Sequence, residues 1–118
     1  MERKYFYYQE KKSILYFFKT EEKNIIKIGV SLDLNTCAKR FRILNGLCPY
    51  RLSRSFCYFE RKDTRKLEKF LHRYLKKYRL NGEWFEVTDQ IVNRIENFKK
   101  IKKFNVVKYK KRLTKKKK

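Results

Sequence analysis

The chain has 118 residues, enough for one domain with one hydrophobic core and too few for a second domain of ordinary size. It is 42% apolar and 17% aromatic, which excludes a fully disordered chain. The formal net charge of +22 favours polyanionic partners, nucleic acid before an anionic membrane surface. We expect no membrane partner, because no apolar run approaches the roughly 20 residues of a spanning helix and the first 12 residues lack a signal-peptide core.

The positive charge is divided unequally along the chain. Residues 99–118 contain 12 of the 34 Lys and Arg residues and no Asp or Glu. We expect an N-terminal arm at residues 1–12, a folded domain at 13–100, and a basic tail at 101–118 that stays disordered until it meets a partner. The tail could serve as a nuclear localisation signal or as a phosphate clamp.

The cysteine and histidine content excludes several kinds of site. The three cysteines, Cys37, Cys48 and Cys57, form no C-x-x-C pair, and His72 is the only histidine. This set argues against a zinc site and against Ser/His/Asp or Cys/His nucleophile systems. We expect buried thiols in a reduced, intracellular protein, nuclear or cytoplasmic if the host is eukaryotic.

Two β-prone segments open the expected domain. Residues 14–20 (ILYFFKT) and 24–30 (NIIKIGV) are rich in β-branched and aromatic side chains. The charged residues between them leave enough chain for a turn, so the two segments predict an antiparallel hairpin.

Residues 31–46 predict a short helix. Cys37, Phe41 and Leu44 fall on one helical face. The possible N-caps are Ser31, Asp33 and Asn35, and Asn45-Gly46 marks the end. Residues 51–59 then alternate as expected for a third strand.

The clearest helical signal lies at residues 63–78, after an N-cap at Asp63 or Thr64. Its apolar residues recur at helical spacing: Leu67, Phe70, Leu71, Tyr74, Leu75 and Tyr78. An Asn81-Gly82 turn leads into a short strand at residues 84–87. The last helix, residues 88–100, is capped by Thr88 and presents Ile91, Val92, Ile95 and Phe98 on one face.

The short strand lies in the most unusual stretch of the chain, RLNGEWFEV. We expect Trp84 and Phe85 to anchor it by burial, and Glu83 and Glu86 to pair with Lys or Arg at the surface. The element order is β-β-α-β-α-β-α, without a run of β-α-β crossovers. The sequence therefore predicts an α+β domain with a small antiparallel sheet flanked by helices.

Four side chains are candidates for a functional site, and none is convincing alone. Glu68 lies at the border of the apolar stripe of the 63–78 helix, so it is either a salt-bridge partner or a ligand for a hard cation. Arg40 is either a solvated or phosphate-contacting charge or part of an active site. Tyr16 lies in the middle of the first strand, where a tyrosine is usually a packing residue of the core or the sheet face. Lys27 alternates with two isoleucines, so it points away from the side that they face.

The order of these residues resembles the GIY-YIG nuclease superfamily. The matching motifs are ILY at 14–16, KIG at 27–29, RF at 40–41, E-x-x-L-H at 68–72 and GEWF at 82–85. The closest similarity is to a small branch of that superfamily found in phages, large insect viruses and some fungal meiotic proteins. The resemblance covers residues 14 to about 90, and the pairing of E-x-x-L-H with GEWF is its most specific part.

The resemblance implies a role for most of these residues. Tyr16 would help to activate the attacking water, Arg40 would hold the scissile phosphate, and Glu68 would bind the divalent metal, Mg²⁺ or Mn²⁺. Lys27 stands where many members have a second tyrosine, and His72 matches a histidine of the branch. A lysine could act as a base only if its pKa fell from about 10.4.

Phosphodiester hydrolysis needs an activated water, positive charge near the developing phosphorane and a metal at the leaving oxygen. The leading hypothesis is therefore a metal-dependent endonuclease that nicks or cleaves DNA, with RNA still open as a substrate. The alternatives are a GIY-YIG-like module that binds nucleic acid without cleaving it and a ribosomal-type RNA-binding protein. The residues expected to contact nucleic acid are Lys39, Arg42, Lys110, Lys111, Arg112, Lys115 and Lys116.

Overall fold

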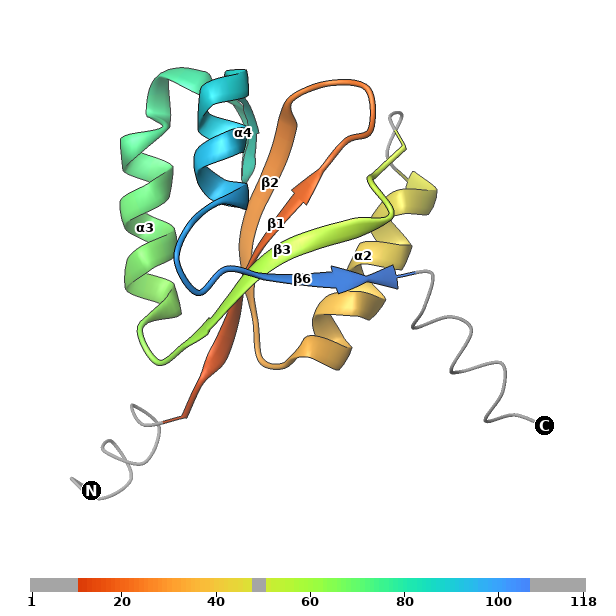
Figure 1. Ribbon diagram of the computed structural model, residues 1–118, viewed down its shortest axis with the longest axis vertical. Coiled ribbons are helices and arrows are strands. Elements are labelled where there is room, and N and C mark those ends of the chain that lie inside the picture. Colours follow the sequence, from red (N-terminus) through yellow and green to blue (C-terminus); the bar gives the residue numbers. More distant parts are fainter. Residues whose placement is uncertain (1–10, 48–50, 107–118) are drawn as a thin grey trace.

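The computed structural model describes residues 11–47 and 51–106. It confirms the α+β prediction, because six antiparallel strands form one sheet that helices cover on both faces (Figure 1). The strands are β1 (Ser13–Lys19), β2 (Ile25–Ser31), β3 (Ser55–Arg61), β4 (Arg79–Asn81), β5 (Trp84–Glu86) and β6 (Lys102–Asn105). The helices are α2 (Leu34–Leu47), α3 (Thr64–Tyr74) and α4 (Asp89–Glu96), with a 3-10 turn η1 (Lys76–Tyr78) after α3.

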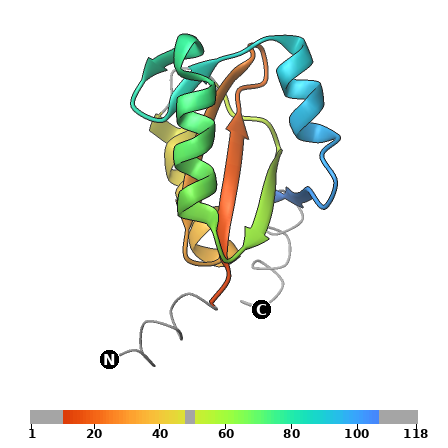
Figure 2. The ribbon, with the colours of Figure 1, turned by 90° about the vertical axis from the view of Figure 1, so that its left-hand side faces the viewer.

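The sheet has the order β4-β5-β2-β1-β3-β6. The predicted hairpin of β1 and β2 therefore lies at its centre, with Tyr16 opposite Gly29 and Phe17 opposite Ile28. β1 reads as a continuous apolar run because both of its faces are covered. Helix α3 lies in front of the strands in the turned view of Figure 2, and α2 lies behind them.

Each face of the sheet has its own apolar cluster. Leu15, Phe17 and Ile28 belong to the cluster under α3 and α4. Tyr16 and Phe18, which alternate with them, belong to the cluster under α2. The α2 face is strongly aromatic, and this packing of rings fixes how Tyr16 is oriented.

The caps explain where the helices begin. Asp33 Oδ1 accepts the Thr36 backbone N–H at 2.7 Å at the start of α2, and Thr88 Oγ1 accepts the Ile91 N–H at 3.2 Å at the start of α4. Asp63 precedes α3 as predicted, but its carboxylate pairs with Arg61 instead of capping the helix.

Two predicted apolar residues of the 63–78 helix are exposed. Leu75 is buried and Leu71 is half-buried against the sheet, whereas Phe70 and Tyr74 are 59% and 63% exposed. These two rings stack on each other with centroids 5.9 Å apart. Fewer apolar residues of α3 than predicted contact the sheet, because α4 covers part of the same face. Phe98, beyond the end of α4, is likewise exposed.

The structure contains two strands that the pattern does not predict. Strand β4 precedes β5, so the Asn81-Gly82 turn, with Gly82 at φ +53°, closes a hairpin. The predicted tail begins at residue 101, but Lys102–Asn105 pair with β3 as β6. The third strand begins at Ser55 instead of residue 51. Most of the predicted arm and the rest of the tail lie outside the described residues.

Candidate active site

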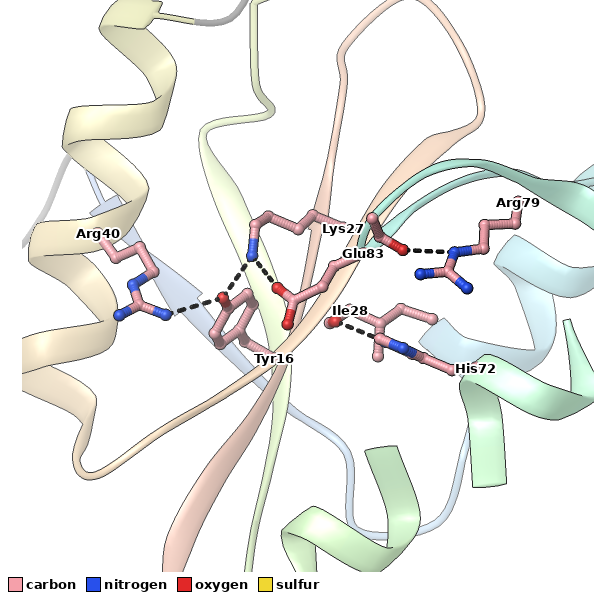
Figure 3. A network of polar contacts seen from close by, with 8 residues as sticks. Tyr16, Lys27, Ile28, Arg40, His72, Arg79 and Glu83 are labelled. Carbon is pink, nitrogen blue, oxygen red and sulfur yellow. Dashed lines mark hydrogen bonds and ion pairs between the residues drawn. The ribbon is translucent and has the colours of Figure 1, made fainter. Parts of the chain in front are cut away.

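The site lies on the α2 face of the sheet, where two cationic side chains converge on one phenol (Figure 3). Tyr16 comes from the middle of β1, Lys27 from β2 and Arg40 from α2. Lys27 Nζ donates to Tyr16 Oη at 2.8 Å, and Arg40 Nη1 donates to the same oxygen at a long 3.5 Å. The structure therefore brings together three of the residues that the resemblance selects.

Hydrogen-bond chemistry fixes the direction of these contacts. The ammonium of Lys27 and the guanidinium of Arg40 can only donate, so Tyr16 Oη accepts from both. The hydroxyl proton of Tyr16 is consequently directed elsewhere. The side chain is fully buried, and its partner Arg40 is exposed to solvent.

Glu83 is the fourth residue of this cluster. The sequence predicts that it lies at the surface. Its carboxylate forms a short hydrogen bond and ion pair with Lys27, whose side chain is 12% exposed against 40% for Glu83. The backbone carbonyl of Glu83 also accepts the Ile28 N–H at 3.0 Å. Pairing with Lys or Arg is confirmed, but the partner lies inside the site.

The only sequence signal for this role is the position of Glu83 within GEWF, immediately before the strand residues Trp84 and Phe85. Trp84 pairs with Lys27 in the β2–β5 register, which brings the preceding carboxylate to the lysine. A single sequence does not state which strand β5 joins, so the contact follows from topology.

The electrostatics keep Lys27 charged. Burial lowers the pKa of Lys27, but its hydrogen bonds to Glu83 and Tyr16 and the charges of these two groups raise it by more, so the pKa lies above its ordinary value. This argues against Lys27 as a general base. The pKa of Arg40 is also raised, first by its hydrogen bond to Tyr16.

Glu68 is half-buried on α3 and is coupled to the same cluster. Burial raises the pKa of Glu68, and the charge of Glu83 and a side-chain hydrogen bond with it raise it further, whereas His72 and Lys27 lower it. Two carboxylates thus lie near each other beside the Lys27 ammonium. Within residues 11–47 and 51–106, no three His, Cys, Asp or Glu side chains form a metal-binding group.

His72 binds the backbone of the sheet instead of the phenol cluster. Its Nε2 lies 2.9 Å from the carbonyl oxygen of Ile28, which can only accept, so Nε2 carries the proton. The imidazole also packs 5.1 Å from the ring of Phe85. This contact ties α3 to β2 at the KIG triplet and sets the position of Glu68 one turn earlier.

The other predicted residues are less closely connected to this cluster. Lys39 is exposed on α2, and Arg42 lies beside a groove near the β6 edge. The tail residues Lys110, Lys111, Arg112, Lys115 and Lys116 fall outside the described part of the chain.

Cys37 and Cys57 are buried free thiols, as predicted. Among the described residues, no helix is long and apolar enough to cross a membrane.

Fold and site together define a small α+β domain in which cations and carboxylates surround one buried tyrosine. The chain belongs to the T5orf172 domain family, whose model matches residues 13–104. This membership indicates a nuclease-like or DNA-binding module and hence a nucleic-acid partner. No curated protein and no solved structure matches the chain.

Proposed function

We propose that the chain is a metal-dependent endonuclease of the GIY-YIG type that nicks or cleaves DNA by attack of water on a phosphodiester bond. The observation that carries the proposal is the convergence of Lys27 and Arg40 on Tyr16 Oη, beside the two carboxylates of Glu68 and Glu83. Packing alone does not require two cations at a buried phenol. Phosphoryl transfer does require positive charge around a group that orients water.

Arg40 is the group that would receive the phosphate. Its 3.5 Å contact with Tyr16 is long, and a phosphate oxygen offers a guanidinium shorter, charge-assisted bonds. Substrate binding would therefore draw Arg40 away from the phenol. Because Tyr16 is fully covered in the described state, this movement would also uncover Oη.

Tyr16 and Lys27 would then act on the attacking water. Tyr16 Oη orients the water towards the phosphorus, and the Lys27 ammonium stabilises negative charge that develops on the phenol oxygen or the phosphate. Glu83 holds the ammonium in place and keeps it protonated. Lys27 is thus an electrostatic group in this scheme and no longer a base.

Glu68 would hold the divalent cation, with Glu83 as its nearest carboxylate neighbour. The donor set fits Mg²⁺ or Mn²⁺, because Mg²⁺ is usually held by one or two carboxylates together with water and substrate phosphate. When bound, the cation would supply Lewis-acid stabilisation of the leaving oxygen.

A binding module without cleavage activity is the second candidate function. The observation that favours it is the full burial of Tyr16 beneath a Lys27–Glu83 ion pair. In such a module the pair would be a structural lock, and nucleic acid would bind only through exposed cations.

Supercoiled plasmid separates the two functions. The protein is incubated with Mg²⁺, Mn²⁺ or EDTA beside Glu68→Gln and Arg40→Ala, with Glu86→Gln and Arg94→Ala as exposed controls. The nuclease proposal expects metal-dependent nicking that both site variants lose and both controls keep. If every protein only retards the plasmid, and salt reverses the shift, the proposal is wrong and the binding module is correct.

A further inference from the structure

A groove with a volume of about 490 Å³ lies on the α2 face towards the β6 edge of the sheet. Three arginines line it, Arg42 from α2 and Arg51 and Arg54 from the segment before β3. On α2, the groove residues Phe41, Arg42 and Asn45 turn away from the side that carries Arg40. The groove is therefore separate from the tyrosine cluster.

The segment that presents Arg51 and Arg54 is held in place by its backbone. The Arg51 carbonyl accepts the Glu21 N–H at 2.8 Å, and the Arg54 carbonyl accepts the Val106 N–H at 3.0 Å. Between them, the Leu52 N–H donates to Asn45 Oδ1 at 2.9 Å. Both arginines are exposed, and their backbone is fixed to Glu21, Val106 and Asn45.

The composition of the groove favours an anion with an apolar part. Glu21 is its one acidic lining residue against three arginines. Phe41 and Leu52 are almost fully buried and form an apolar floor. Arginine binds phosphate through two parallel hydrogen bonds, and a sugar ring can lie over an apolar floor.

The sequence after Val106 is strongly basic. Val106 lines the groove, and residues 107–118 follow it directly in the chain with eight Lys and Arg residues and no Asp or Glu. Connectivity alone keeps the first of these cations within a few residues of the groove.

We propose that this groove is a second phosphate site, which holds the sugar-phosphate backbone of a nucleic acid away from the Tyr16 cluster. The groove would hold the strand through its three arginines. The inference does not depend on cleavage, because an inactive binding module would use the groove in the same way.

The test measures binding without chemistry. DNA binding is followed by fluorescence anisotropy in EDTA across a salt series, with Glu68→Gln as the parent protein. Arg51→Ala/Arg54→Ala is compared with Arg73→Ala/Arg94→Ala, which removes the same charge from the α3 and α4 side. We expect the groove pair to reduce the slope of log K against log salt by roughly 2, since each lost phosphate contact removes about 0.9. We expect Arg73→Ala/Arg94→Ala to change this slope by less than half as much.

Equal slopes for the two double variants, or no change in either, would overturn the inference. Arg51→Lys/Arg54→Lys guards against misfolding, because it keeps both charges; we expect it to restore the slope but not the full affinity. Inorganic phosphate at matched ionic strength distinguishes a free-anion site from a backbone site. We expect it to displace DNA no better than chloride does, and selective displacement would contradict the proposal. None of these outcomes depends on nicking, so they do not coincide with a failure of the nuclease proposal.

Discussion

Gly29 lies opposite Tyr16 in the β1–β2 pairing, and the tyrosine fills the space that a side chain at position 29 would need. A Cβ at this position would lie 2.3 Å from Oη and 2.5 Å from Cζ of Tyr16. The tyrosine ring has little freedom to move, because it is fully buried and stacks on Phe18 with centroids 4.1 Å apart. Position 29 must therefore be glycine if Tyr16 is to keep its place in the sheet.

Gly29→Ala is therefore expected to displace Tyr16 from its two cations. Nicking should fall by about 100-fold, and the free energy of unfolding by about 1–3 kcal/mol through overpacking. Gly46→Ala is the control, because its new Cβ meets nothing within 4 Å beyond its chain neighbours and its own helix backbone; in α2 the change should stabilise by roughly 0.5–1 kcal/mol. Normal nicking by folded Gly29→Ala would show that the position of the phenol is unimportant.

Glu83→Gln should change the pH dependence of nicking. Glu83 is one of the groups that raise the pKa of Lys27, so its neutralisation lowers that pKa. Nicking that needs the Lys27 ammonium is lost as pH rises through this pKa. The alkaline limb of the pH–rate profile should therefore move to lower pH. Glu86→Gln, an exposed carboxylate of the same strand, should leave the limb in place. An unchanged profile for Glu83→Gln would refute the electrostatic role of Lys27.

His72→Ala tests a structural role for the imidazole. Loss of its bond to the Ile28 carbonyl should lower the free energy of unfolding by about 1–3 kcal/mol, while nicking by the folded protein falls less than tenfold. Urea denaturation measures the first quantity and plasmid nicking the second, with Arg73→Ala as the neighbouring exposed control. Unchanged stability together with abolished nicking would instead assign chemistry to His72.

Cys37 should make the fold sensitive to alkali. Burial raises the pKa of its thiol from 9.0 to about 12, so above pH 9 the unfolded chain ionises while the folded chain does not. The unfolded state is then favoured, and stability should fall by about 1.4 kcal/mol per pH unit for this group. Urea denaturation of Cys37→Ala should show a shallower decline between pH 9 and 11. Equal slopes in the two proteins would contradict the assignment.

The parts of the fold that were predictable are those with a local pattern. The β1–β2 hairpin follows from two β-prone runs on either side of a short turn, and α3 follows from helical spacing within one segment. Strand β6 has no such pattern, because Lys102 and Lys103 resemble a solvated tail. It forms because β3 offers a free edge and Phe104 stacks on Phe56 with centroids 5.3 Å apart.

The same reasoning explains the candidate site. Tyr16 and Lys27 lie on neighbouring strands of one hairpin, so their proximity follows from short-range sequence. Glu83 reaches Lys27 only because β5 joins the far edge of β2, and this long-range pairing has no signature in a single sequence. The exposure of Phe70 likewise depends on how α3 and α4 divide one face of the sheet.

Tyr16→Phe tests the role of the phenol in cleavage, because it removes only the oxygen shared by Lys27 and Arg40. Its control is Tyr58→Phe, because Tyr58 lies opposite Tyr16 in β3. We expect Tyr16→Phe to bind DNA with wild-type affinity and to nick plasmid at least about 100-fold more slowly, a barrier increase of about 2.7 kcal/mol, while Tyr58→Phe nicks normally. Equal nicking rates for the two variants would contradict this role of the phenol.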